Sequence, residues 1–145
     1  MNTTNTLRHN TIFLIDDDPI TNFIHTKIIQ GSFSFTATAF TNAMDALVEL
    51  EKCQATGFHS MPALIFLDIN MPRMDGWEFL DELKKLSGEL FKRYNVVMVT
   101  SSLDREDIER SKTYACVKEF ISKPLNVQTI KDLVLLVGDN SFVGK

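Results

Sequence analysis

The 145-residue chain is about one domain long, and 44% of its residues are hydrophobic, enough to bury one core but hardly two. No apolar run approaches the roughly 18 residues that a membrane span needs, and the opening MNTTNTLRHN lacks the apolar stretch of a secretory signal. The net charge of -4 and the lack of a Lys/Arg cluster argue against a nucleic-acid surface. We expect a cytoplasmic domain that contacts neither nucleic acid nor membrane directly.

Five short apolar runs alternate with segments of helical periodicity, which is typical of βα units around a parallel sheet. Strands are expected near 11–15, 33–39, 63–68, 95–100 and 117–121, and helices near 19–30, 41–55, 76–87, 104–113 and 126–137. The folded domain would span residues 11–137. Residues 1–10 and 138–145 would be loose tails.

The apolar pattern of each strand predicts its place in the sheet. The first, third and fourth runs are continuously apolar, as expected of central strands covered by helices on both faces. The second alternates with polar residues, and the fifth contains Lys118 and Glu119, so both are expected at edges. With right-handed crossovers, this predicts a doubly wound α/β fold: a five-stranded parallel sheet of order 2-1-3-4-5.

Capping signals and apolar stripes predict how the helices begin and which faces they bury. Asp18-Pro19 supplies an N-cap and a first-turn proline, and Asp75 to Glu78 has the spacing of a capping box. Two stripes are expected to dock on the sheet, one in the first helix and one in the last: Ile20, Phe23, Ile24 and Ile28, and Val127, Ile130, Leu133, Val134 and Val137.

The cysteines and histidines do not form a metal or disulfide pattern. Cys53 and Cys116 are isolated, so both are expected to be buried or inert thiols. His9, His25 and His59 lack metal-ligand spacing and are expected to be structural or solvated.

Polar residues stand at the carboxyl ends of four predicted strands. Asp16-Asp17-Asp18 follow the first, Asp68 ends the third, Thr100 ends the fourth and Lys123 follows the fifth. Taken singly, each has a plain structural explanation as a cap, a strand residue or a solvated side chain. Their joint placement favours a shared pocket, because ligands of open α/β sheets bind where the strand order reverses.

The residue types in this pocket suit phosphoryl transfer. Clustered carboxylates repel one another unless a cation joins them, and Mg²⁺ prefers oxygen ligands. An aspartate carboxylate can attack phosphorus to form an aspartyl phosphate. A metal ion, the Lys123 ammonium and the Thr100 hydroxyl would then stabilise charge on the phosphoryl oxygens.

Four segments resemble the bacterial two-component response-regulator receiver family, in its stand-alone chemotaxis-type form with a flavodoxin-like fold. They are Leu14–Asp18, Leu67–Gly76, Val99–Ser101 and Ser122–Pro124, in order and at the family's spacing. The resemblance implies that Asp68 is the phosphoacceptor. It also implies that Asp17, Asp68 and the backbone carbonyl of Asn70 bind Mg²⁺, or Mn²⁺ as a substitute, and that Asp16 helps through water.

The same resemblance implies a signalling role without turnover of a separate substrate. The domain would catalyse its own phosphorylation by a sensor histidine kinase or histidine phosphotransfer domain, and its own dephosphorylation. Thr100 would contact the phosphoryl group and move, Lys123 would pair with that group, and Phe120 would occupy the aromatic switch position, without the hydroxyl of the more frequent tyrosine.

The signal would leave through a protein surface rather than an effector domain, because only residues 138–145 follow the last predicted helix. By resemblance, this surface comprises 104–113, 117–121 and 126–137, and it would bind a downstream protein. The chain itself is expected to be a monomer or weak dimer. Residues 114–119 replace the small Gly/Ala-rich turn of many relatives, which bears on this surface.

Two other functions need to be weighed. Asp16-x-Asp18 after an apolar strand is similar to haloacid-dehalogenase-type phosphatases, but Ile20 stands where they carry Thr or Val, and no acidic pair follows Lys123 on a further strand. A receiver-fold binding module not regulated by phosphorylation is the second alternative. Such modules often lose the acidic pocket, which is complete here.

Overall fold

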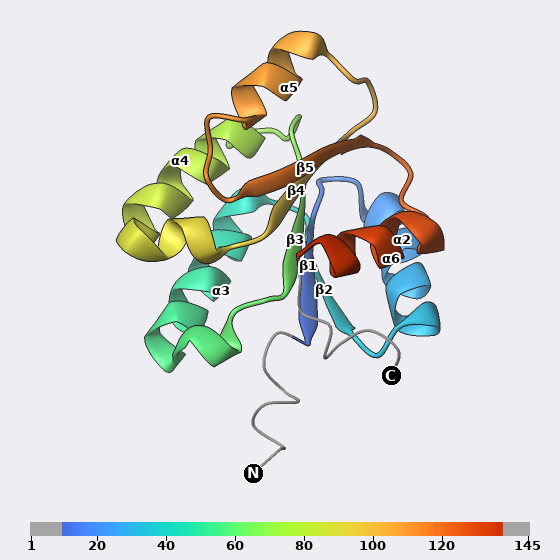
Figure 1. Cartoon of the computed structure of the whole chain (residues 1–145), viewed down its shortest axis with the longest axis horizontal. Helices are drawn as coiled ribbons and strands as arrows, with labels where there is room; N and C mark the ends of the chain where they lie inside the picture. Colours follow the sequence, from blue (N-terminus) through green and yellow to red (C-terminus); the bar gives the residue numbers. More distant parts are fainter. Residues whose placement is uncertain (1–9, 138–145) are drawn as a thin grey trace.

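The computed structural model describes residues 10–137, in which a five-stranded parallel sheet lies between two layers of helices (Figure 1). The strand order is β2-β1-β3-β4-β5, so the predicted doubly wound topology is confirmed. The elements are β1 (Thr11–Ile15), α2 (Pro19–Ser32), β2 (Thr36–Phe40), α3 (Ala43–Thr56), η1 (Phe58–Ser60), β3 (Leu64–Asp68), α4 (Gly76–Ser87), η2 (Gly88–Arg93), β4 (Val96–Thr100), α5 (Arg105–Ser111), β5 (Val117–Ser122) and α6 (Val127–Leu136). The predicted tails, apart from Asn10, lie outside the described residues.

The three central strands are buried almost throughout, as their continuous apolar runs predicted. One hydrophobic cluster packs the sheet against α3 and α4, and a second packs the opposite face against α2 and α6. Helices therefore cover both faces, which explains why polar side chains enter β3 and β4 only at their last residues, Asp68 and Thr100.

The second strand starts later than predicted, because α2 is longer. The helix continues to Ser32 and ends with the Phe33 N–H donating to the Ile29 carbonyl at 3.0 Å. Phe35 is buried, but strand pairing begins only where Thr36 aligns with Thr11. The alternating phenylalanines thus belong to the helix end and the following connection.

The docking face predicted for α2 is wrong for three of its four residues, and only Ile28 is partly buried against the core. Ile20, Phe23 and Ile24 are 69%, 61% and 47% exposed. The helix instead buries the face that carries Asn22, His25 and Ile29. The stripe predicted for α6 is correct for Ile130, Leu133 and Val134, which join the core. Val137 is partly buried against the same cluster, whereas Val127 is exposed.

The predicted helix starts are confirmed. The Asp18 side chain accepts the Ile20 N–H at 2.9 Å, and Asp75 and Glu78 form a reciprocal capping box with distances of 2.8 and 2.9 Å. Cys116 is a buried free thiol, as expected. Among the described residues, none of the helices combines the length and the apolar character needed to cross a bilayer.

Side-chain stacking connects α5 to α4. The Arg110 guanidinium of α5 lies 4.5 Å from the ring centroid of Trp77 in α4. The Tyr114 ring stacks on Trp77 at 5.8 Å, and its hydroxyl donates to Asp81 at 2.9 Å. Tyr114, the first residue of the segment 114–119, therefore fixes the α5–β5 connection to α4.

Candidate functional site

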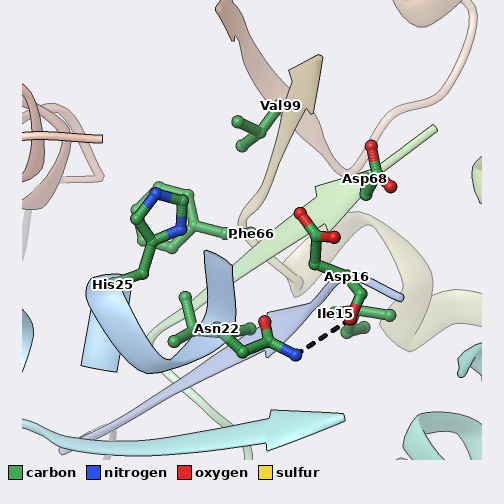
Figure 2. A pocket seen from close by; sticks show the side chains of 8 residues that line it. Ile15, Asp16, Asn22, His25, Phe66, Asp68 and Val99 are labelled. Carbon is green, nitrogen blue, oxygen red and sulfur yellow. Dashed lines mark hydrogen bonds between the residues drawn. The ribbon is translucent and has the colours of Figure 1, made fainter. Parts of the chain in front are cut away.

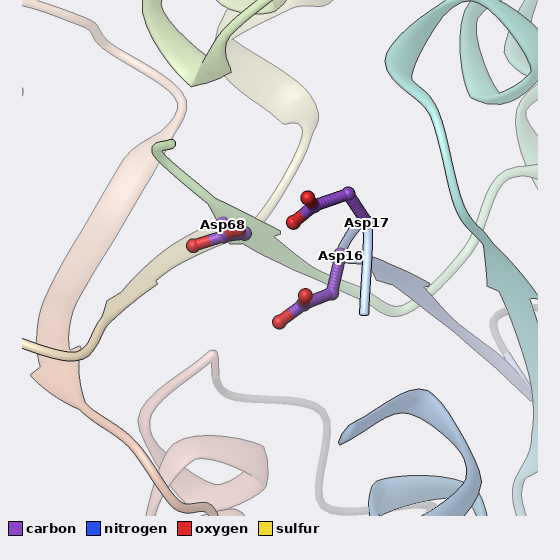
Figure 3. Close-up of side chains that lie close together, drawn as sticks. All are labelled: Asp16, Asp17 and Asp68. Carbon is purple, nitrogen blue, oxygen red and sulfur yellow. The ribbon is translucent and has the colours of Figure 1, made fainter. Parts of the chain in front are cut away.

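Three carboxylates gather at the carboxyl ends of β1 and β3 (Figure 3). Asp16 and Asp17 follow β1, and Asp68 ends β3, which pairs with β1 up to Leu67. One carboxylate oxygen from each residue lies within 4.8 Å of the other two. Asp16 and Asp68 are buried, whereas Asp17 is exposed. The predicted meeting of these side chains is thus observed.

Lys123 lies between the two buried carboxylates. Its Nζ is 2.6 Å from Asp16 Oδ2 and 3.4 Å from Asp68 Oδ1. Burial disfavours the ammonium form, but the hydrogen bond to Asp16 and the charge of Asp68 outweigh it and raise the pKa of Lys123. The lysine therefore remains a cation in the pocket. Its backbone N–H donates to the Thr100 carbonyl at 2.7 Å, which fixes where the chain leaves β5.

The electrostatics of Asp68 indicate excess negative charge in the pocket. Burial and the charge of Asp16 raise the pKa of Asp68 to about 6, with a smaller contribution from Asp17 and against the opposing effect of Lys123. One cation does not balance three carboxylates. A divalent cation with hard-oxygen preference fits this donor set, since the oxygens are close enough to share one ion and carry charge that the ion would neutralise.

The loop after Asp68 packs so closely that it requires glycine at its end. The Gly76 N–H donates to the Ile69 carbonyl at 2.8 Å. A Cβ at position 76 would lie 2.8 Å from the Asp68 carbonyl oxygen and 3.0 Å from the Ile69 Cα. Within the loop, Arg73 adopts a positive φ of 70°, and Asn70 is exposed. The role of the Asn70 carbonyl as a metal ligand stays a prediction.

The two predicted switch residues end or belong to the last two strands, and their side chains have partners outside the carboxylate cluster. Thr100 is buried one residue after Val99, which pairs with Asp68. Its hydroxyl donates to the Ser102 carbonyl at 3.2 Å and accepts the Ser102 N–H at 3.3 Å. Phe120 is half-buried against the cluster beneath α3 and α4. Their switching roles stay predictions.

Asn22 and His25 belong to the site, although the sequence reasoning gave neither a role there. With Asp16 and Asp68, they line a cavity of about 10 Å³, room for about one water molecule (Figure 2). His25 is buried, which agrees with the expected structural role. The sequence did not indicate that it lies beside the pocket. Asn22 and His25 are three residues apart and therefore share one face of α2, which was the sequence signal for their role. The apolar stripe of α2, however, predicted that a different face is buried.

Comparisons with known proteins agree with this geometry. The response regulator receiver domain family matches residues 12–135. A probable methanogenesis regulatory protein, FilR2 of Methanothrix harundinacea, is 26% identical over 85% of this chain and 77% of its own length. The chain spans about half or less of several other curated relatives.

Solved structures give the same result. A two component response regulator from Cytophaga hutchinsonii has a TM-score of 0.81 and 31% identity, covering 90% of this chain and 97% of that one. The CheX-CheY-BeF3-Mg²⁺ complex from Borrelia burgdorferi contains a chain with a TM-score of 0.70 and 23% identity, covering 88% and 87%. The strand order, the pocket and the family match over nearly all the described residues lead to one conclusion: the chain belongs to the response-regulator receiver family.

Proposed function

We propose that this chain accepts a phosphoryl group from a phosphohistidine donor onto Asp68 in a Mg²⁺-dependent reaction and signals through a protein partner. The observation that carries the proposal is the pocket itself. A buried carboxylate, Asp68, stands at a strand end with two further carboxylates and the Lys123 ammonium within reach.

The transfer step follows from these positions. A carboxylate oxygen of Asp68 attacks phosphorus, the phosphorus–nitrogen bond of the donor breaks, and its electron pair stays on the imidazole nitrogen. Lys123 pairs with the phosphoryl oxygens after transfer, since its Nζ already lies 3.4 Å from Asp68 Oδ1. A Mg²⁺ ion held by Asp17, Asp68 and the Asn70 carbonyl, with Asp16 helping through water, would neutralise charge on the phosphoryl oxygens, with Mn²⁺ as a substitute. Attack by water on the same phosphorus would restore Asp68.

The surface beside the pocket suits a protein donor. A surface cavity of about 210 Å³ opens between α2 and the loop after β5, lined by Thr21, Ile24, His25, Ser101, Lys123 and Pro124. Exposed Ile20, Phe23 and Ile24 on α2 supply apolar contact area at its side, of the kind that protein interfaces use. These features support a histidine kinase or a histidine phosphotransfer domain as the donor.

The output would leave through a second surface, formed by α5, β5 and α6. A phosphoryl oxygen on Asp68 offers the Thr100 hydroxyl a charged acceptor in place of the Ser102 carbonyl. Movement of Thr100 would free space for Phe120 to turn inward, which shifts a two-state equilibrium in the partner surface. The domain, residues 11–137, would act as a monomer or weak dimer that binds a downstream protein or relays the group to a histidine domain.

The first experiment is labelling of the purified chain with acetyl phosphate and MgCl₂, followed by intact-mass spectrometry. We expect one phosphoryl group per chain, no labelling of Asp68→Asn, and unchanged labelling of the exposed control Asp132→Asn. Persistent modification of Asp68→Asn would refute the site. Rapid phosphate release from small phosphomonoesters would instead indicate the phosphatase, and a chain that no acyl phosphate or phosphohistidine donor labels would be a binding module.

A second experiment tests the output route. Thr100→Ala should still be labelled, but the amide NMR shifts that phosphorylation causes in residues 101–125 should largely disappear. Labelled Thr100→Ala with the shifts of labelled wild type would show that the signal takes another route.

A further inference from the structure

The inward face of α2 contains polar residues at positions where its apolar residues would be expected. Asn22 and His25 are each 4% exposed, while Ile20 and Phe23 of the same helix lie mostly in solvent. Burying polar groups is unfavourable unless they form hydrogen bonds, and exposing large apolar side chains gives up their burial. This orientation of the helix therefore requires specific inward contacts.

Those contacts reach both loops that build the pocket. The Asn22 amide donates to the Asp16 carbonyl at 2.8 Å and to the Phe40 carbonyl at 3.3 Å, which holds the loop after β1. His25 Nε2 accepts the Leu125 N–H at 3.2 Å, which holds the loop after β5. The side chains carried by these loops, Asp16 and Lys123, form the 2.6 Å ion pair.

The backbone around Lys123 is therefore anchored on both sides. Ahead of the side chain, the Lys123 N–H donates to the Thr100 carbonyl. Two residues later, the buried Leu125 N–H has the His25 ring as its acceptor. Only the neutral ring with its proton on Nδ1 can accept at Nε2. Burial lowers the pKa of His25, which favours this neutral form.

We propose that His25 is a positioning residue, which fixes the Leu125 amide and thereby places the Lys123 ammonium over Asp16 and Asp68. It acts through the loop and does not touch the transferred group. The effect on transfer rests on the proposed function, whereas the hydrogen bond to Leu125 does not. His25→Leu removes the hydrogen-bond acceptor but keeps a side chain of similar volume. His25→Gln can place its amide oxygen where Nε2 of the imidazole lies and so restore an acceptor.

A matched control separates positioning from ordinary packing. Ile29 is fully buried one turn further along α2, so Ile29→Ala weakens the seating of the helix without removing the Leu125 acceptor. We expect His25→Leu to slow labelling by acetyl phosphate at saturating MgCl₂ about ten-fold. His25→Gln should recover most of the rate, and Ile29→Ala should label at nearly the wild-type rate although it lowers the melting temperature.

NMR of the unlabelled protein tests the anchor directly. Wild type should show a nitrogen–nitrogen coupling through the hydrogen bond between Leu125 and the His25 ring, with ring shifts of the Nδ1–H tautomer. His25→Leu should shift the Lys123 and Leu125 amides, and Ile29→Ala should leave them in place. Absence of the coupling, or equal labelling losses in His25→Leu and Ile29→Ala, would overturn the proposal. A wild type that cannot be labelled would refute the proposed function, and the coupling and the two amide shifts would still decide whether His25 holds the loop.

Discussion

Replacing Asp68 by asparagine should stabilise the metal-free protein, although it removes the proposed phosphoacceptor. Burial and the Asp16 charge raise the pKa of Asp68 from 3.8 to about 6. The folded state then holds the Asp68 proton more tightly than the unfolded chain does. The contribution of this proton to the free energy of unfolding is fully present below pH 3.8 and is lost as the pH rises to 6. A difference of about 2 pKa units, at about 1.36 kcal/mol per unit, means that the ionised Asp68 carboxylate lowers the free energy of unfolding by about 3 kcal/mol at neutral pH.

Asp68→Asn should recover part of that amount, about 1–3 kcal/mol, because Lys123 keeps its 2.6 Å contact with Asp16. Urea unfolding in EDTA at pH 7.5 measures the gain, with exposed Glu51→Gln as a control that should change stability by less than about 0.5 kcal/mol. The gain should shrink to a few tenths of a kcal/mol near pH 4, where the wild-type carboxyl is increasingly protonated in both states. A variant no more stable than wild type at pH 7.5, or equally stabilised at pH 4, would refute the charge argument.

Three further substitutions test other parts of the structure. Gly76→Ala should destabilise the protein by about 1–3 kcal/mol in urea unfolding and slow labelling, because its Cβ would lie 2.8 Å from the Asp68 carbonyl oxygen; wild-type stability would contradict that close approach. Asp17→Ala should largely remove the rise in melting temperature that Mg²⁺ causes in the unphosphorylated protein, and an undiminished rise would exclude Asp17 as a principal ligand. Burial raises the pKa of the Cys116 thiol to about 12, so the folded state keeps a proton that the unfolded chain loses above about pH 9; the contribution of this thiol to stability should fall by about 1.4 kcal/mol per pH unit between these values, and Cys116→Ala should make the decline of stability with pH shallower by that amount.

The central strands could be predicted because each is marked by a local run of apolar residues. The pocket could be predicted because the carboxyl ends of neighbouring parallel strands lie at the same edge of the sheet. Continuous apolar runs mark strands covered on both faces, and residues that follow such strands must meet at one edge. Asp16, Asp68 and Lys123 were brought together by this reasoning alone. No pattern in the sequence, however, shows that Lys123 contacts Asp16 more closely than Asp68.

The orientation of α2 could not be predicted in the same way. Hydrophobic periodicity assumes that the apolar stripe is buried, and it found Ile20, Phe23 and Ile24. The structure turns the helix because Asn22 and His25 have partners far away in the sequence, at Phe40 and Leu125. Long-range hydrogen bonds of this kind leave no periodic signal, so the sequence cannot reveal them before the fold is known.

The stack between α4 and α5 gives this protein an intrinsic optical probe. Trp77 is the only tryptophan in the chain, so all indole emission comes from one place. Arg110 lies over its ring and Tyr114 stacks against it, and both belong to the segment from α5 to β5. Displacement of α5 relative to α4 would move a cation away from the indole and change its emission. Fluorescence without any attached dye can therefore follow the motion of α5 in real time.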